Sequence, residues 1–468
     1  MRRAPPRASR RLQRAAGSGP MASLSSRALT SAPAASGAAS RGGGGNGKFL
    51  LRLAWRNLSR HRRRTVITTV ALAVSVAVLI FMDSMLGGID QESQRNLVWY
   101  ETGSGRVVTH AQLEDLDQVA LKHELVDYLP LSEALSARGI ANTPRVGFVG
   151  ELFFGEGSLP IRLIGIDPDT DEDVYRLRDS LLPDSSYLEA GIPGLILGSW
   201  TTDDLGLSLG DFVEVRTRTR HGAMQVLELE LVGILLSPNP TINRGVGYLP
   251  LDVAQYDLEM EGVTEISLGA LPSGLGRPIA VPTGAFLNRE IERLNAELGA
   301  RFPNAAAVGW PQLARDYLAL METKSSSNAM LLFLILLIAA VGISNTMLIA
   351  VYERIREFGM MRALGMDDAA IRATMVFEAG IIGLLGSMAG LVVGAAATFW
   401  LVNWGIDVSG LYGDVSIGYR VTGEFRGAWN PGTLATSVVF GVLASMAIAL
   451  LPARRALRLD VVQCLRHE

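Results

Sequence analysis

Residues 352–374 read YERIREFGMMRALGMDDAAIRAT, a short charged stretch with the spacing of an amphipathic helix. It lies between two of the most apolar runs in the chain, one over 329–351 and one over about 376–402. Runs of that length are long enough to cross a bilayer. The charged stretch therefore predicts a helix at the membrane surface that connects two membrane spans, and the rest of the chain divides around it.

The composition is that of a protein only partly in a membrane. Of its 468 residues 49% are hydrophobic and 19% are charged, with a mean hydropathy of +0.26. This is too apolar for an ordinary soluble protein and too charged for a chain buried wholly in lipid. The net charge of −3 argues against a polyanion binder, so no nucleic-acid partner is expected. The single cysteine, Cys464, excludes an intramolecular disulfide.

Four apolar runs are long enough to cross a bilayer, which takes about 20 residues. The alternative, buried helices of a soluble protein, is disfavoured by the length of the runs and their near lack of charge. Arginine and lysine gather before the first run, within the opening stretch and after the fourth run, so the positive-inside rule places these parts and both termini in the cytoplasm. The predicted spans are 65–89, 327–351, 376–402 and 432–452.

The segments between the spans include one that is long enough for a folded domain. Strand-like alternation and helical periodicity are both present there, which predicts an α+β domain. The strand patterns are at 105–111, 145–154, 161–167, 211–220 and 227–235, and the helical patterns at 131–138, 201–208, 285–299 and 312–324.

The predicted fold is thus an α-helical membrane protein with four transmembrane helices and a large extracytoplasmic α+β domain inserted between helices 1 and 2. Its remaining segments are a disordered basic N-terminus (1–47), a cytoplasmic interfacial helix (48–64), the extracytoplasmic domain (90–326), a cytoplasmic amphipathic helix (352–375), an extracytoplasmic loop (403–431) and a cytoplasmic tail (453–468).

No constellation in the sequence points to catalysis, a cofactor or a metal. GGGGNGKF at 42–49 resembles a phosphate-binding loop, but Phe49 stands where Ser or Thr would hold magnesium, and no strand precedes it. The acidic stretch DPDTDED at 167–173 lacks the glycine and final Glu of an EF-hand loop, so a solvated turn is a better interpretation than a calcium site. We therefore expect no catalytic, cofactor-binding or metal-binding residues.

The third run carries a face of small residues. Gly386, Gly390 and Gly394 recur every four residues, and Gly383 precedes them. Such spacing lets helix backbones approach closely, but it fits packing within the chain and a seam between two subunits equally well. Glu378, near the start of this run, is expected at the cytoplasmic interface rather than in a proton relay.

The segment SNTMLIAVYERIREFGMMRALGM (344–366) closely resembles the one that joins the second and third spans of FtsX-like and MacB-like ABC transporter permeases. The resemblance extends to AWRNLSRHRRRT (54–65), to PARRALRLDVVQCLRHE (452–468) and, more weakly, to LIGIDPD (163–169) of the MacB-like periplasmic core. In that family the segment forms a coupling helix for an ATPase. The residues that match its motif are Glu353, Arg354, Glu357, Phe358, Gly359, Arg362, Ala363, Leu364 and Gly365.

The resemblance implies a non-catalytic permease that works by mechanotransmission. A separate ATPase chain, which holds ATP and magnesium, would push on the coupling helix, and the external domain would expel a cargo. The lipoprotein-releasing (Lol) branch is closest, because this chain has a large external domain, no ATPase domain and an LRHE terminus. The implied partners are the ABC ATPase, a second permease chain (identical or different), a lipoprotein cargo and a periplasmic acceptor. The implied location is the bacterial inner membrane.

Two related functions stay open beside lipoprotein release. They are a MacB-type export permease for small molecules or peptides, and an FtsX-like membrane regulator of an extracytoplasmic enzyme. In each case the amphipathic helix would offer Ile355, Phe358 and either Met361 or Leu364 as anchors for a groove on the ATPase. A charged loop that merely connects two spans is the simpler alternative.

Overall fold

The computed structural model describes residues 62–113, 121–272, 278–279, 281–282, 284–353, 355–407 and 424–456. All of these fall within one compact unit, Phe49–Glu468. The predicted N-terminal segment, nearly all of the predicted interfacial helix, most of the loop between the last two spans and most of the C-terminal tail lie outside the described residues.

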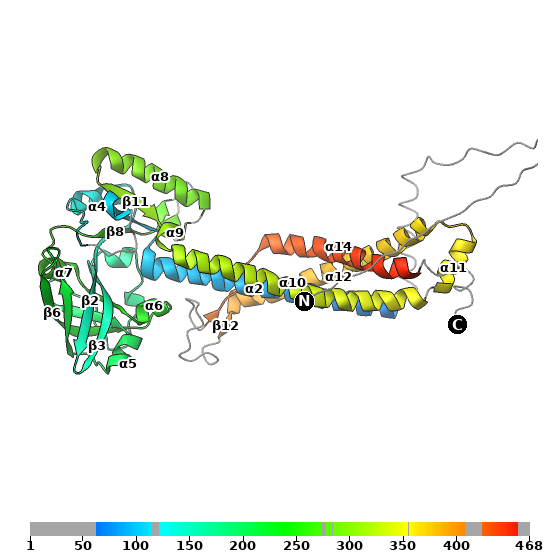
Figure 1. The fold of residues 1–468 in the computed structure, drawn as a ribbon, viewed down its shortest axis with the longest axis horizontal. Coiled ribbons are helices and arrows are strands. Elements are labelled where there is room, and N and C mark those ends of the chain that lie inside the picture. Colours follow the sequence, from blue (N-terminus) through cyan, green and yellow to red (C-terminus); the bar gives the residue numbers. More distant parts are fainter. Residues whose placement is uncertain are drawn as a thin grey trace, which may run out of the picture. The chain divides into compact units, whose positions relative to one another are not determined.

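Four long helices contain the four apolar runs, and Figure 1 shows them side by side. Three helices of the described part are long and apolar enough to cross a membrane, over Thr65–Thr102, Asp368–Trp404 and Pro431–Leu451. The remaining apolar run lies in a helix of 39 residues. The four helices are α2 (Arg62–Leu97), α10 (Arg315–Glu353), α12 (Asp368–Trp404) and α14 (Pro431–Ala456).

A nine-stranded sheet forms the domain between α2 and α10. Its strand order is β11-β1-β8-β2-β3-β7-β4-β6-β5, and β2 also pairs with β5, which closes six of the strands into a barrel. Two neighbouring pairs, β3 with β7 and β4 with β6, are parallel, and the other pairs are antiparallel. The strands are β1 (Gly105–Thr109), β2 (Asn142–Phe154), β3 (Gly157–Ile166), β4 (Gly194–Gly198), β5 (Phe212–Arg218), β6 (Met224–Leu235), β7 (Val246–Pro250), β8 (Glu265–Leu268) and β11 (Ala305–Gly309).

The remaining elements are short apart from α8. The helices are α3 (His110–Leu113), α4 (Tyr128–Ala137), α5 (Ser199–Leu205), α6 (Pro240–Asn243), α7 (Leu251–Asp257), α8 (Gly284–Arg301), α9 (Trp310–Leu313) and α11 (Ile355–Ala363). The single turns are η1 (Val98–Thr102), a π-helical turn, and the 3-10 turns η2 (Asp171–Asp173) and η3 (Arg178–Ser180). Two-residue strands are β9 (Leu271–Pro272), β10 (Pro278–Ile279), β12 (Ile406–Asp407) and β13 (Glu424–Phe425).

Alternation in the sequence explains which side chains fill the domain. Along β5 the buried and exposed residues alternate strictly, so that Val213, Val215 and Thr217 face inward. At the other end of the sheet, the side-chain amide of Asn295 on α8 accepts from the backbone N–H of Ala307 (2.6 Å) and donates to its carbonyl (2.9 Å). The edge strand β11 is thus covered by a helix that imitates a neighbouring strand, which protects the edge from other chains.

The amphipathic helix predicted over 352–375 differs in the structure. Only Ile355–Ala363 form the separate helix α11, and residues from Asp368 onward already belong to α12. Gly365 separates them: its φ of +89° is a left-handed conformation that favours glycine. Backbone bonds from Gly365 N–H to Arg362 and from Met366 N–H to Met361 close the turn.

Candidate functional site

One side of α11 is buried against the ends of α12 and α14. Ile355 is only 2% exposed. Met361 and Met366 pack against a small cluster of Ile371, Met375 and Ala453. The prediction that Ile355 anchors a partner protein is therefore wrong for this conformation, because its side chain already packs within the chain.

The opposite side of α11 is exposed and partly apolar. Met360 is 48% exposed and Leu364 is 88% exposed, and the two lie one helical turn apart. Arg356, one turn before Met360, is also exposed. The sequence predicted Leu364 as an anchor but missed Met360, although a spacing of four residues from Leu364 would have pointed to it.

The other predicted residues of this segment have mixed positions. Arg354 and the side chains of Glu353 and Phe358 lie outside what the structure describes. Gly359 is buried, whereas Ala363 is exposed and Glu357 is half-buried. The guanidinium Nε of Arg362 lies 3.0 Å from a carboxylate oxygen of Asp368, which joins the end of α11 to the start of α12.

The glycine face of α12 packs within this chain. A Cβ at Gly386 would lie 2.8 Å from Leu72 of α2, and one at Gly390 would lie 2.6 Å from the carbonyl oxygen of Ala73. Gly394 similarly faces α2, while Gly383 faces α14. Since α2 and α14 cover these glycines, the face does not serve as a seam between subunits in this conformation. Glu378, on the same helix, is 7% exposed.

The far end of α2 is part of the core of the β domain. Leu97 and Val98 are 1% and 2% exposed in the larger core cluster, and Tyr100 is 6% exposed in a second one. The start of α10 is rooted in the same way, since Tyr317 belongs to the larger cluster and Leu318 packs against it. Residues 98–104, which include η1, join α2 to β1, and residues 310–314, which include α9, join β11 to α10; the two strands are paired with each other.

Four hydrogen bonds fix η1 to the domain. The backbone N–H of Arg176 donates to the carbonyl of Trp99. The hydroxyls of Ser180 and Tyr100 form a second bond, and Glu101 accepts the other two. These are Arg176 N–Trp99 O (3.1 Å), Ser180 Oγ–Tyr100 Oη (2.9 Å), Asn239 Nδ2–Glu101 Oε2 (2.9 Å) and Arg106 Nη2–Glu101 O (2.7 Å). Gly103 ends η1 with a φ of +63°, two residues before β1. The end of α2 and the domain therefore form one rigid piece.

The segment that holds η1 is itself pinned by a buried ion pair. Asp171 accepts from Nε and Nη2 of Arg145 at 2.9 and 2.7 Å, and the two side chains are 0% and 1% exposed. The guanidinium of Arg145 also lies 3.4 Å from the ring centre of Tyr175. Burial raises the pKa of the Asp171 carboxyl, and the neighbouring arginine opposes that rise. The solvated turn predicted for 167–173 is thus wrong at Asp171.

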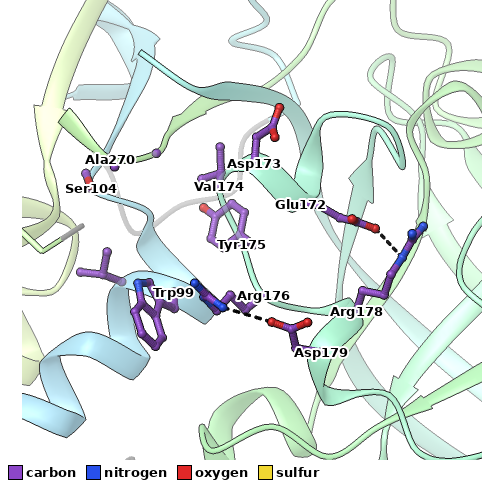
Figure 2. A pocket seen from close by; sticks show the side chains of 12 residues that line it. Trp99, Ser104, Glu172, Asp173, Val174, Tyr175, Arg176, Arg178, Asp179 and Ala270 are labelled. Carbon is purple, nitrogen blue, oxygen red and sulfur yellow. Dashed lines mark hydrogen bonds and ion pairs between the residues drawn. The ribbon is translucent and has the colours of Figure 1, made fainter. Parts of the chain in front are cut away.

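A cavity of about 300 Å³ opens beside this junction. Figure 2 shows Trp99 and Arg176 on one side of it, with Asp179 paired to Arg176 and Glu172 paired to Arg178. Charges of both signs and aromatic rings line it, without a nucleophile and base in contact. Among the described residues no group of three or more His, Cys, Asp or Glu is placed to hold a metal ion.

Comparisons with known proteins find similarity to transporter permeases. Residues 329–461 match the family described as FtsX-like permease C-terminal. The chain is 24% identical over 417 residues to the lipoprotein-releasing system transmembrane protein LolC of Xylella fastidiosa (strain 9a5c), covering 85% of this chain and 92% of LolC. It is 20% identical to the uncharacterized ABC transporter permease MJ1507 of Methanocaldococcus jannaschii, covering 90% and 98%.

A third relative matches a shorter part of the chain. The macrolide export ATP-binding/permease protein MacB of Hyphomonas neptunium is 33% identical over 133 residues, which are 28% of this chain and 18% of MacB. Among solved structures, the extracellular domain of the YknZ transporter from Gram-positive bacteria has a TM-score of 0.30 at 12% identity, covering 44% of this chain and 99% of that domain.

Proposed function

Because the chain is an ABC transporter permease of the FtsX, LolC and MacB kind, we propose that it releases lipoproteins from the bacterial inner membrane. Its similarity to LolC over most of both chains supports this assignment. In this proposal four helices cross the membrane, the β domain is extracytoplasmic and both termini are cytoplasmic. A separate ABC ATPase binds ATP and magnesium, a second permease chain completes the transporter, and this chain catalyses no reaction.

Two long helices have one end buried in the core of the β domain. This is the observation that best supports transmission of force. A tilt of α2 would move Leu97 and Val98, which are buried in the larger core cluster, and a tilt of α10 would move Tyr317 in the same cluster. Protein cores are close-packed, so they transmit such displacements instead of absorbing them. Motion driven from the α11 end would therefore reach the β domain as a rigid-body displacement.

The exposed side of α11 is the surface that fits the ATPase. Met360 and Leu364 form a small apolar patch beside Arg356. Apolar anchors one turn apart are what a helix presents to a hydrophobic groove. The packing of Met361 on Ile371, Met375 and Ala453 would meanwhile hold α11 on α12 and α14, so that a push on the patch moves those helices too.

The test uses the purified full chain with its ATPase in proteoliposomes that carry a lipoprotein. We expect Leu364→Asp to abolish both the stimulated ATP hydrolysis and the release of the lipoprotein into solution with a soluble acceptor. The matched control is Tyr256→Asp, because Tyr256 is 87% exposed on the β domain, far along the chain from α11. Stimulated hydrolysis without any release of lipoprotein would support an ABC permease but refute this cargo.

Export of small molecules or peptides is the second candidate. The higher identity to MacB, 33% over 133 residues, favours it. The match covers 28% of this chain, whereas the match to LolC covers 85%, so it supports this candidate less than the first. Transport of a small molecule by the same proteoliposomes, with no release of lipoprotein, would establish it.

A further inference from the structure

The outer face of the barrel carries charges that are sorted by sign along strand β5. The exposed residues of this strand, in chain order, are Phe212, Glu214, Arg216 and Arg218. Because successive side chains of a strand point to opposite faces, these alternate residues all lie on the outer face. One end of the strand is therefore acidic on that face, and the other end is basic.

The neighbouring strand β6 adds two carboxylates to the acidic end. Glu228 is the cross-strand partner of Glu214. Glu230, two residues further on, is the partner of Phe212, whose ring is 60% exposed. The acidic end of the face thus consists of three glutamates beside an exposed aromatic side chain.

The basic end of the face is also its most apolar part. On β6, Val226 is the partner of Arg216 and is 52% exposed. Met224 is the partner of Arg218 and is 64% exposed. On the other neighbouring strand, β2, Val149 is 62% exposed on the same outer face. Exposed apolar side chains gathered in this way mark a surface that another protein covers.

The charges of this face are poorly compensated within the chain. Glu214 and Glu228 lie directly opposite each other, and like charges in that position destabilise an antiparallel pair. Arg216 lies 3.7 Å from Glu214, but the two side chains are 48% and 58% exposed, and an exposed pair of this kind contributes little to stability. Glu151, the β2 partner of Arg216, accepts from the hydroxyl of Ser158 at 3.0 Å. Basic groups of another protein, placed over the acidic end, would relieve the repulsion.

A face with this pattern is complementary to a second copy of itself. In a dimer with twofold symmetry both chains use the same patch, so the acidic end of one copy lies over the basic end of the other. The glutamates of each copy would then face the arginines and the exposed apolar side chains of its neighbour.

From this charge pattern we propose that two copies of the chain dock through the outer faces of β2, β5 and β6, with the twofold axis between the acidic and the basic end. The inference rests on the proposed function for the pairing of two permease chains. It adds that the second chain is an identical copy and that the two β domains meet at this face.

The experiment uses the purified full chain with Cys464→Ser, so that Val226→Cys, next to the proposed axis, supplies its only thiol. Native mass spectrometry measures whether a pair forms, and crosslinking with a short bismaleimide measures whether this face forms it. We expect a crosslinked dimer. The crosslinked fraction should fall about tenfold when the basic end is reversed (Arg216→Glu with Arg218→Glu) or the acidic end is reversed (Glu214→Arg with Glu228→Arg), because each variant sets like charges against each other.

Co-expression of the two charge-reversal variants, each with its own tag, is the sharpest test. A mixed pair sets an acidic face against a basic one, so its crosslinked fraction should return to the level of the unaltered face. The matched control places the thiol at Tyr256→Cys, which is 87% exposed on α7 and should give little crosslinked dimer.

Three results would refute the proposal. They are equal crosslinking through the two thiol positions, a mixed pair that crosslinks no more than either variant alone, and a chain that stays monomeric. A pair detected by native mass spectrometry without the crosslink at Val226→Cys would refute this face but leave the pairing of permease chains intact. The release of lipoprotein is measured separately, so failure of the proposed function is distinguished from failure of this inference.

Discussion

The two ends of the helix bundle are anchored very differently. At one end α2 and α10 continue into the large core of the β domain, where Leu97 is 1% exposed. At the other end Met361 of α11 packs against a cluster in which, among the described residues, three are buried: Ile371, Met375 and Ala453. The difference suggests that the two ends have different roles. Force would be applied at α11, which is held by few contacts, and would be transmitted to the domain through a rigid junction.

The largest effect is expected at the rigid end, from Gly103→Ala. A Cβ there would lie 2.6 Å from the carbonyl oxygen of Leu268, and its φ of +63° is unfavourable for alanine. Strain and collision each cost about 1–3 kcal/mol, so we expect a loss of about 4 kcal/mol in the free energy of unfolding. Denaturant titration of the chain in detergent, followed by tryptophan fluorescence, measures it.

Gly139→Ala is the control for this prediction. Gly139 also has a positive φ, +78°, but a Cβ there meets nothing within 4 Å. It should show the strain alone, about 1–2 kcal/mol. An equal loss of unfolding free energy in both variants would mean that the segment after α2, at Gly103, is not closely packed against β8.

A smaller effect is expected between the two ends, from Gly390→Ala. The added methyl would lie 2.6 Å from the carbonyl oxygen of Ala73 and 2.7 Å from Val76, so α2 and α12 must separate. We expect the thermal midpoint of the detergent-solubilised chain to fall, by the equivalent of about 2–3 kcal/mol. Ala396→Val, which enlarges an exposed residue of the same helix, should leave the midpoint nearly unchanged.

At the lightly held end, Ile355→Ala should loosen α11. Removing a buried isoleucine side chain costs about 2–5 kcal/mol, and we expect the lower value here because Ile355 is the first residue of a short helix. The loss should be local, so that hydrogen exchange rises over residues 355–366 and not in the β domain. Leu364→Ala, on the exposed side of α11, should leave hydrogen exchange unchanged. Equal exchange in both variants would contradict the burial of Ile355.

The sequence predicted the parts of this fold that show a strong alternation of apolar and polar residues or a long apolar run. The alternating pattern at 211–220 is β5 in the structure, and the apolar runs lie in the long helices. The strands β4, β7, β8 and β11 were missed because every residue in them is buried, so they show no alternation. The helical pattern at 312–324 was recognised, but in the structure it forms the start of the 39-residue helix α10 and not a separate helix.

The site depends on contacts that no local pattern reveals. Asp171 looks like part of a solvated acidic turn until its partner, Arg145, is known, and these two residues are 26 positions apart. The orientation of α11 was equally hidden, since periodicity shows an apolar face but not which neighbour covers it. The structure shows that Ile355 faces inward and Leu364 outward.

The smallest effect on stability is expected from the ion pair that joins α11 to α12. Arg362 and Asp368 are 22% and 41% exposed, so the pair should contribute less than about 1 kcal/mol. Its role in coupling can still be larger, because it fixes the angle of the input helix. We expect Arg362→Asp to lower ATP-driven release, and the exchange of both charges, Arg362→Asp with Asp368→Arg, to restore it. A direct contact of Arg362 with the ATPase predicts the opposite, since returning a positive charge at position 368 would not replace it.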